Sequence, residues 1–527
     1  MQGDSDTHKK KVSRLYTTSL SAQSRTQLAR AFALAKHGRI FDARKELNAV
    51  RQTFAMDGTS TDQQRADLIL VDAHVRTYED GLIIDDAAKL KWVLTVCDSH
   101  DFIGQGLALN QLCILSMHEG NLDKAQEYGE SAIRLYGHGE AEFGSIHLLA
   151  HLGQIKLRRG DLYGAVEQYM EMEGRLDEDH DDTASLLAVC RALRSEAAYE
   201  MDNLVESETL LDSAFQSIED VDSWLDVRAA AYRVRIRLAY NRSGLPGAMT
   251  ELSRCEQIAK QRSMPRLLWM MQIERVRILT LSNEIKAAKN FMLTIGLDPN
   301  SYKLQGEDWV FRQSSTAVDL ARWMVCASRA TDALRFLESA EDFAIRRGQL
   351  LSLAKLRVIK ASAHWRLNQR IDATSALISA VRLLGQQPFR RFILDEGQDI
   401  LQIVQAILEG HSVSARISPA QRKRFADLSY LSTLQRNDGR GRSVTNSSAN
   451  WLARDKAGKY LELLGLGMPN KEIGRIMGVS VNTVKYHLKS IYRDLKVVNR
   501  TQAVVEAKRL GNAVTATPTG DRLSSDI

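Results

Sequence analysis

Side chains that could bind a ligand by charge are concentrated near the C-terminus of this 527-residue chain. Residues 451–510 contain 12 Lys and Arg against 5 Asp and Glu, which gives this segment a net charge of +7. The whole chain carries 71 Lys and Arg and 65 Asp and Glu, a net charge of +6, so the other residues sum to −1. A basic excess confined to one short segment predicts a polyanionic partner, above all a nucleic acid.

Residues 481–495 have the pattern of a helix that could present these charges. Its apolar stripe, at helical spacing, consists of Val484, Leu488, Ile491 and Leu495. The opposite face is polar and basic, with Asn482, Lys485, Tyr486, Lys489 and Arg493. Because the major groove of B-DNA admits an α-helix and phosphates attract its cations, we expect this helix to bind DNA.

Three shorter helices are expected around it, at about residues 454–464, 470–477 and 501–510. We expect Asn470 and Ser480 to cap the second and third helices, because short polar side chains accept hydrogen bonds from free backbone amides. The residues of the first two helices expected to face inward are Tyr460, Leu461, Leu464, Ile473, Ile476 and Met477.

This segment resembles the LuxR-type helix-turn-helix domain over residues 470–503 without a gap. The matching residues are Asn470-Lys471-Glu472-Ile473, Val479-Ser480, Thr483-Val484-Lys485, His487-Leu488, Ile491-Tyr492, Leu495, Val497, Asn499-Arg500-Thr501 and Ala503. The resemblance implies a four-helix domain over residues 451–511 that binds double-stranded DNA. The chain departs from the family pattern at four positions, which are Ala457, Gly474, Asp494 and Lys496.

The resemblance also implies individual roles. Val484 and Lys485 are expected at base edges or adjacent phosphates, and Asn482 at the position that tunes sequence choice. Phosphate contacts are expected from Lys471, Thr483, His487, Asn499 and Arg500. The other residues expected at the DNA are Asn470, Ser480, Lys489 and Arg493. A homodimer contact is expected on the fourth helix, through Ala503, Val504, Ala507 and Leu510.

Most of the chain before this domain carries a weak repeat, in which a turn residue is followed five positions later by a small residue on a new helix. The instances are Gly38 to Ala43, Gly120 to Ala125, Gly160 to Ala165, Asp202 to Ser207, Ser243 to Ala248, Ser282 to Ala287, Ser328 to Ala333 and Asn368 to Ala373. A degenerate unit lies near Asp80 to Ala87. A period near 40 residues predicts stacked helix pairs. One pair cannot bury its apolar stripe alone, so the pairs should stack into a superhelix.

Residues 25–408 resemble the tetratricopeptide-like domain of MalT-type regulators. The closest local match lies within residues 373–402 and consists of Ala376-Leu377, Ala380, Arg391-Phe392 and Asp395-Glu396-Gly397. The resemblance implies a solenoid that senses an effector or a partner. An α-solenoid without this relationship is the alternative.

We therefore predict an all-α protein in five parts. These are a polar tail (1–24), a tetratricopeptide-like solenoid (25–408), a flexible linker with a possible short helix near residues 419–434 (409–450), the helix-turn-helix domain (451–511) and a disordered tail (512–527).

Signatures of other functions are missing. The sequence contains no P-loop, no G-x-S-x-G and no H-E-x-x-H motif, and no run of about 18 apolar residues. The cysteines are scattered and favour reduced cytosolic thiols over a metal site, at positions 97, 113, 190, 255 and 326. We expect no catalytic residues, no cofactor, no metal and no membrane contact, and a location in the bacterial cytoplasm, at the nucleoid.

Two functional hypotheses remain. In the first, a transcriptional regulator uses the solenoid to sense a small-molecule effector or a protein partner and uses the C-terminal domain, as a dimer, to bind DNA. In the second, the solenoid is an interaction scaffold controlled by a protein partner, and the DNA-binding domain is a tether. Thermal shift against small molecules separates the two, because a bound effector stabilises the folded state by mass action.

Overall fold

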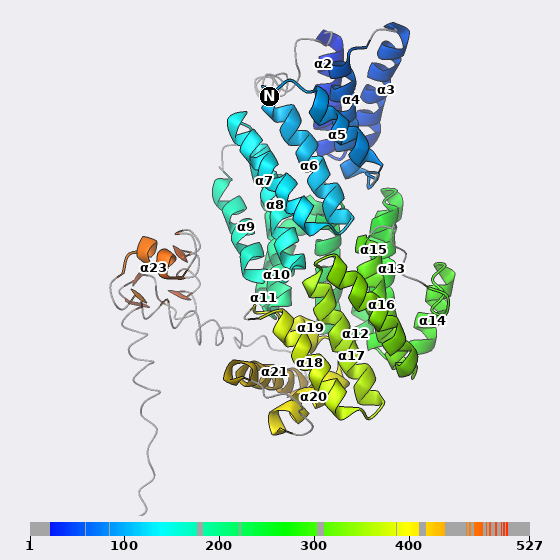
Figure 1. The fold of residues 1–527 in the computed structure, drawn as a ribbon, viewed down its shortest axis with the longest axis vertical. Helices are drawn as coiled ribbons and strands as arrows, with labels where there is room; N and C mark the ends of the chain where they lie inside the picture. Colours follow the sequence, from blue (N-terminus) through cyan, green and yellow to red (C-terminus); the bar gives the residue numbers. More distant parts are fainter. Residues whose placement is uncertain are drawn as a thin grey trace, which may run out of the picture. The chain divides into compact units, whose positions relative to one another are not determined.

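A computed structural model gives the fold, shown in Figure 1. It describes residues 22–57, 60–83, 85–176, 183–220, 223–302, 310–385, 387–410, 418–437, 460, 463–464, 468–477, 481, 484–485, 488, 491–492, 497, 499–500 and 502–503. Every regular element within these residues is a helix, so the all-α prediction is confirmed. The chain divides into two compact units, Met1–Arg442 and Ser443–Ile527.

The first unit is a series of antiparallel helices that follow one another in space in sequence order (Figure 1). Its N-terminal half contains α2 (Ala22–Lys36), α3 (Ile40–Asp57), α4 (Asp62–Tyr78), α5 (Asp86–Val96), α6 (Phe102–His118), α7 (Leu122–His138), α8 (Glu142–Arg158), α9 (Leu162–Arg175), α10 (Thr183–Glu200) and α11 (Leu204–Asp220). Its C-terminal half contains α12 (Leu225–Gln261), α13 (Pro265–Leu281), α14 (Ile285–Thr294), α15 (Val310–Cys326), α16 (Ala330–Arg346), α17 (Leu350–Arg366), α18 (Arg370–Leu383), α19 (Arg391–Leu394), α20 (Gln398–Glu409) and α21 (Pro419–Asn437).

The predicted turn residues reverse the chain between paired helices. Gly120, with φ of 76°, ends α6, and Ala125 on α7 is fully buried. Left-handed backbone also occurs at the predicted turns Gly38, Gly160, Asp202, Ser328 and Asn368. Their small partners are fully buried at Ala43, Ala165, Ser207, Ala333 and Ala373. A small side chain lets the second helix pack close to the first, so the repeat prediction is confirmed at these units.

In two predicted units the turn residue is wrong by one position, although Ala248, the small residue predicted for the first of them, is fully buried. The left-handed residue is Gly244 (φ 64°) where Ser243 was expected, and it kinks α12 just before Pro246. The other is Asn283 (φ 63°) where Ser282 was expected. Ala288 is therefore the buried small residue of that unit, and the predicted Ala287 is exposed.

The superhelix turns far enough for late helices to pack on early ones. Helix α17 contacts α8, and α19 contacts α10. Backbone hydrogen bonding fixes this closure, since the Arg390 amide donates to the Glu200 carbonyl at 2.8 Å. The Tyr163 amide likewise donates to the Gln387 side chain at 2.9 Å. The short segment around α19 therefore lies inside the superhelix, between α10 of the N-terminal half and α17 of the C-terminal half of the solenoid.

The possible short helix near residues 419–434 is confirmed as α21, but it does not belong to a flexible linker. Its Phe425 and Leu428 are buried in the largest core of the solenoid. The helix starts with a reciprocal cap, in which the Gln421 amide donates to the Ser418 hydroxyl at 3.2 Å and the Ser418 amide donates to the Gln421 side chain at 2.9 Å. The solenoid therefore continues through α21.

Candidate functional site

The C-terminal unit is organised around a small apolar core. The core consists of Tyr460, Leu463, Leu464, Ile473, Val484, Leu488 and Ile491. Helix α23 (Asn470–Met477) contributes Ile473, and the other described residues of the predicted third helix are helical at 481, 484, 485, 488, 491 and 492. The predicted stripe of Val484, Leu488 and Ile491 is therefore confirmed as the inner face of this helix.

Some residues of this unit lie differently from the prediction. Ile476 is 44% exposed, because it lies on the outer face of α23 while Ile473 points inward. Val484 and Ala503 are fully buried in the unit itself, so neither side chain is available to a base edge or to a second copy. The residue at the N-cap of α23 is Pro469 and not the expected Asn470, because the Pro469 carbonyl accepts a hydrogen bond from the Ile473 amide at 3.1 Å.

Asn499 and Arg500 hold the fourth helix in place. The Asn499 side chain accepts a hydrogen bond from the Gln502 amide at 2.9 Å, which caps the helix N-terminus. Arg500 donates to the carbonyl oxygens of Met468 (2.7 Å) and Leu464 (3.3 Å) and so ties the fourth helix to the end of the first. Both side chains therefore have intramolecular partners, and the phosphate contacts expected of them stay predictions.

Lys471 and Lys485 are the predicted DNA-contacting cations that the described part of the unit presents to solvent. Lys485 lies on the helix that carries the buried Val484, one position further along the chain, and Asn470 is half-buried at the start of α23. The other predicted residues lie outside the described ones, namely Ser480, Asn482, Thr483, His487, Lys489, Arg493, Val504, Ala507 and Leu510.

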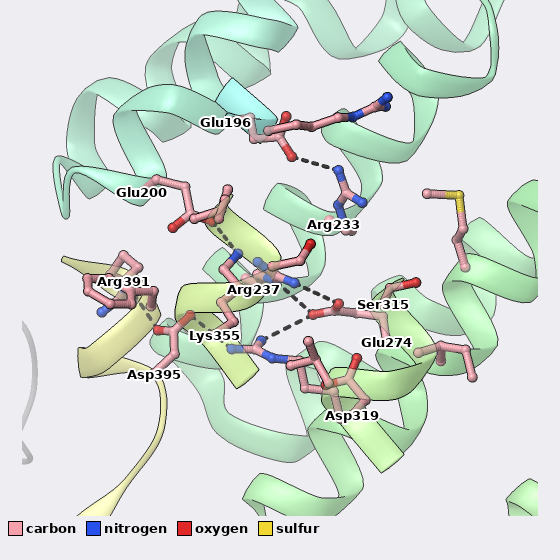
Figure 2. A pocket seen from close by; sticks show the side chains of 18 of the residues that line it. Glu196, Glu200, Arg233, Arg237, Glu274, Ser315, Asp319, Lys355, Arg391 and Asp395 are labelled. Atoms are coloured by element: carbon pink, nitrogen blue, oxygen red, sulfur yellow. Dashed lines mark hydrogen bonds and ion pairs between the residues drawn. The ribbon is translucent and has the colours of Figure 1, made fainter. Parts of the chain in front are cut away.

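The solenoid contains a second candidate site, a cavity of about 150 Å³ inside the superhelix (Figure 2). Helices α8, α10, α12, α13, α15, α17 and α19 contribute to its lining. Seven lining side chains are cationic: Arg158, Arg233, Arg237, Arg277, Arg322, Lys355 and Arg391. Six are anionic: Glu196, Glu200, Glu274, Asp319, Asp395 and Glu396. The lining therefore carries nearly balanced charge.

These charges form a chain of ion pairs between helices. Arg237 contacts both carboxylate oxygens of Glu274, at 2.8 and 2.9 Å, and Arg277 bridges Glu274 (3.2 Å) to Asp395 (3.0 Å). Burial raises the pKa of the Glu274 carboxyl, but Arg237 and Arg277 outweigh it and hold that pKa well below its usual range. These groups are therefore charged at neutral pH and satisfied by one another.

The same pattern continues around the cavity. Glu196 pairs with Arg233 at 2.7 Å and Glu200 with Lys355 at 2.9 Å. Arg391 Nε makes no hydrogen bond but lies 3.2 Å from Asp395 Oδ1 in an ion pair. Three further atoms of buried lining side chains have no hydrogen-bond partner, namely Glu200 Oε2, Gln154 Oε1 and Arg391 Nη2. Buried polar atoms are nearly always satisfied, so these three call for a missing partner.

Reasoning from the sequence did not find this cavity. An inward-facing charge and a solvated charge look alike in a helical pattern. One signal was present in Arg391 and Asp395, which belong to the motif that the resemblance singled out.

Among the described residues, no group of His, Cys, Asp and Glu could hold a metal ion. None of the described helices has the length and apolar character needed to cross a membrane.

Comparison with protein families gives two matches along the chain. Residues 87–409 match the model of the MalT-like TPR region, and residues 459–507 match that of bacterial regulatory proteins of the luxR family. These matches fall on the superhelix and on the small C-terminal unit, respectively.

Two curated relatives and one solved structure resemble the chain. The HTH-type transcriptional regulator AlkS of Ectopseudomonas oleovorans is 24% identical over 462 residues, which cover 85% of this chain and 49% of the relative. MalT of Yersinia enterocolitica is 22% identical over 413 residues, covering 74% and 44%. The chain thus spans about half the length of these relatives. A Rap protein complexed with competence and sporulation factor has the same type of fold, with a TM-score of 0.53, 12% identity and coverage of 69% of this chain and 99% of that one.

Proposed function

This chain belongs to the family of MalT-like TPR regions, and we propose on that basis that it is a transcriptional regulator that binds DNA through its C-terminal unit and senses an effector through its solenoid. The observation that carries the proposal is the placement of Lys485. This lysine is exposed on the helix whose inner face, at Val484, Leu488 and Ile491, forms the core of the unit. An exposed cation on a helix with a buried inner face supports the proposal that this helix enters the major groove.

The regulatory part of the proposal rests on the division of the chain. The solenoid continues through α21, and the DNA-binding unit is a separate compact body that starts at Ser443. Control would then come from the solenoid exposing, withholding or pairing the DNA-binding units. Pairing alone raises occupancy of a two-site operator through effective concentration. We further propose that the protein binds DNA as a homodimer.

The test compares a fragment of residues 440–527 with the full chain and with residues 1–437. We expect the fragment to fold, to be mostly monomeric and to bind DNA with lower affinity than the full chain and without effector dependence. Residues 1–437 should not bind DNA. Sedimentation and binding isotherms across a salt series measure these quantities. A folded fragment that binds no DNA would contradict the proposal.

A further inference from the structure

The solenoid cavity has a charge pattern that narrows the class of its ligand. A bare anion placed among its seven cations would also face six carboxylates. An apolar ligand would leave the unpartnered polar atoms of the lining buried without a hydrogen bond, which is unfavourable. Only a molecule that carries both signs of charge complements such a lining.

We propose that this cavity binds a small zwitterion with an ammonium and a carboxylate group, as in a free amino acid or a very short peptide. This inference rests on the proposed function, because it names the ligand class of the sensing solenoid. Three features of the cavity support it, namely its unpartnered atoms, its size and its position in the chain.

The unpartnered atoms include both a donor and acceptors. Arg391 is buried, and its Nη1 and Nε are paired with Asp202 and Asp395, but its Nη2 donates to nothing. Glu200 Oε2 and Gln154 Oε1 accept nothing. A carboxylate would satisfy the guanidinium and an ammonium would satisfy the two oxygens. Charge-assisted hydrogen bonds of this kind are the strongest that a ligand can make here.

The size of the cavity limits what it can enclose. An apolar protein cavity of about 150 Å³ holds a molecule of the size of benzene. This cavity measures about 150 Å³, so it matches a small amino acid or one residue of a peptide. A nucleotide or an oligosaccharide exceeds that volume and would have to extend out of the cavity.

The position of the cavity connects it to the rest of the chain. Arg391 and Asp395 belong to α19 and the turn that leads directly into α20, and α20 packs on α21. Asp395 takes part in ion pairs with Arg277 and Arg391. A ligand that exchanged partners with these groups would act on the segment that precedes the DNA-binding unit.

The experiment uses the full chain, calorimetry and thermal unfolding. The probes are the twenty free L-amino acids, glycylglycine and trialanine. Each amino acid that binds is then compared with three derivatives. Its amide lacks the carboxylate, its N-acetyl derivative lacks the ammonium, and its N-acetyl amide lacks both charges. We expect binding and a raised Tm only with the zwitterion, and the peptide arm separates a free amino acid from a peptide source. Equal binding of the amide or the N-acetyl derivative, or no binding by any zwitterion, would overturn the proposal.

Variants locate the site. Glu200→Gln keeps the shape of the side chain but removes its charge, and we expect it to weaken ligand binding about tenfold or more. Lys355→Gln, at the other end of the same ion pair, is the second variant if the first does not fold. Glu256→Gln is the matched control, because Glu256 forms a bidentate pair with Arg275, at 2.8 and 3.0 Å, away from the cavity lining. An unchanged affinity in both cavity variants would refute the site.

DNA binding by the same preparations separates this proposal from the function on which it rests. If the full chain binds DNA but no zwitterion, the ligand assignment fails alone. If it binds neither, the proposed function fails as well.

Discussion

The two units of the chain use charged residues in opposite ways. In the solenoid, Glu274, Arg277 and Arg322 are each less than 10% exposed and pair with one another or with neighbouring carboxylates. In the described part of the C-terminal unit the core is apolar, and Lys471 and Lys485 face solvent. The charges that line the cavity of the first unit therefore pair with one another, whereas the described lysines of the second unit face solvent and are available to a partner.

This difference predicts opposite responses to salt. Exposed cations that neutralise phosphates lose affinity steeply as salt rises, because the counterions released on binding become harder to release. Ion pairs inside a protein are screened much less. The fold of the solenoid should therefore persist at salt concentrations that abolish DNA binding.

The largest expected effect comes from breaking the inward network. Glu274→Gln removes the charge that Arg237 and Arg277 share, so the buried Arg237 loses its carboxylate partner and Arg277 keeps only Asp395. The free energy of unfolding should fall by about 3–5 kcal/mol. Urea unfolding of the full chain, followed by circular dichroism, measures it.

The control for this variant is Asp42→Asn, which breaks the Arg39–Asp42 pair, where the side chains are 62% and 40% exposed. A surface pair contributes at most about 1 kcal/mol. If the two substitutions cost the same, the buried network has no special role in stability.

Acidification tests the buried groups of the N-terminal half. Burial lowers the pKa of His151 to about 4 and that of His74 to about 3, so the unfolded chain binds more protons than the folded one below pH 6.5. Asp67 acts in the opposite direction, because burial raises its pKa to about 7. Burial also lowers the pKa of His118 and His147 and raises the pKa of Asp80 and Asp101. The four histidines outweigh the three carboxyls, so the free energy of unfolding should fall between pH 6.5 and pH 4.5, by about 2 kcal/mol or more.

Urea unfolding at several pH values measures this dependence. Asp67→Asn removes part of the opposing contribution, so the fall should be steeper in that variant. A stability that stays flat or rises over this interval would show that these imidazoles are not held neutral by burial.

A smaller effect is expected at the outward charges of the C-terminal unit. Lys485→Ala should weaken specific DNA binding by about 1–3 kcal/mol if the lysine meets a base. If it meets a phosphate, the loss should be uniform across sequences and the salt slope should fall by about 1. Lys45→Ala, at an exposed lysine of α3, is the control. Unchanged specific and non-specific affinity in the Lys485 variant would remove this residue from the interface.

Sequence reasoning reached the features set by local pattern. The period of the turns, the buried small residues such as Ala125 and the stripe of Val484, Leu488 and Ile491 follow from helical spacing alone. The ion pair between Arg277 and Asp395 does not, because superhelix closure brings together residues 118 positions apart.

Two other features had a sequence signal that was not used. Ser418 and Gln421 have the spacing of a reciprocal helix cap, and so do Asn499 and Gln502. The first pair marks the start of α21 within the supposed linker. The second gives Asn499 a capping role in addition to the phosphate contact that remains predicted for it.

The smallest expected effect concerns the two turns on either side of α16. One turn has a serine at its left-handed position and the other has a glycine. Ser328 precedes the helix with φ of 61°, and Gly348 follows it with φ of 62°. A left-handed residue with a side chain destabilises the folded state by about 1–2 kcal/mol relative to glycine. Glycine in turn lowers the free energy of unfolding by about 0.4–1 kcal/mol, because it increases the conformational entropy of the unfolded chain. Ser328→Gly should therefore raise the free energy of unfolding by about 0.5–1 kcal/mol, and Gly348→Ala should lower it by a similar amount.

Gly160→Ala separates conformation from packing in the same comparison. Gly160 has φ of 77°, and a Cβ there would lie 2.7 Å from Leu384 Cδ2, whereas a Cβ at Gly348 would meet no atom within 4 Å. The Gly160 variant should lose more stability than the Gly348 variant, because Leu384 belongs to the layer of the superhelix that closes on the early repeats. Urea midpoints with unchanged slopes measure all three variants. If Gly160→Ala and Gly348→Ala cost the same, Leu384 moves aside freely, and the contact between late and early repeats is looser there than the hydrogen bond between Tyr163 and Gln387 indicates.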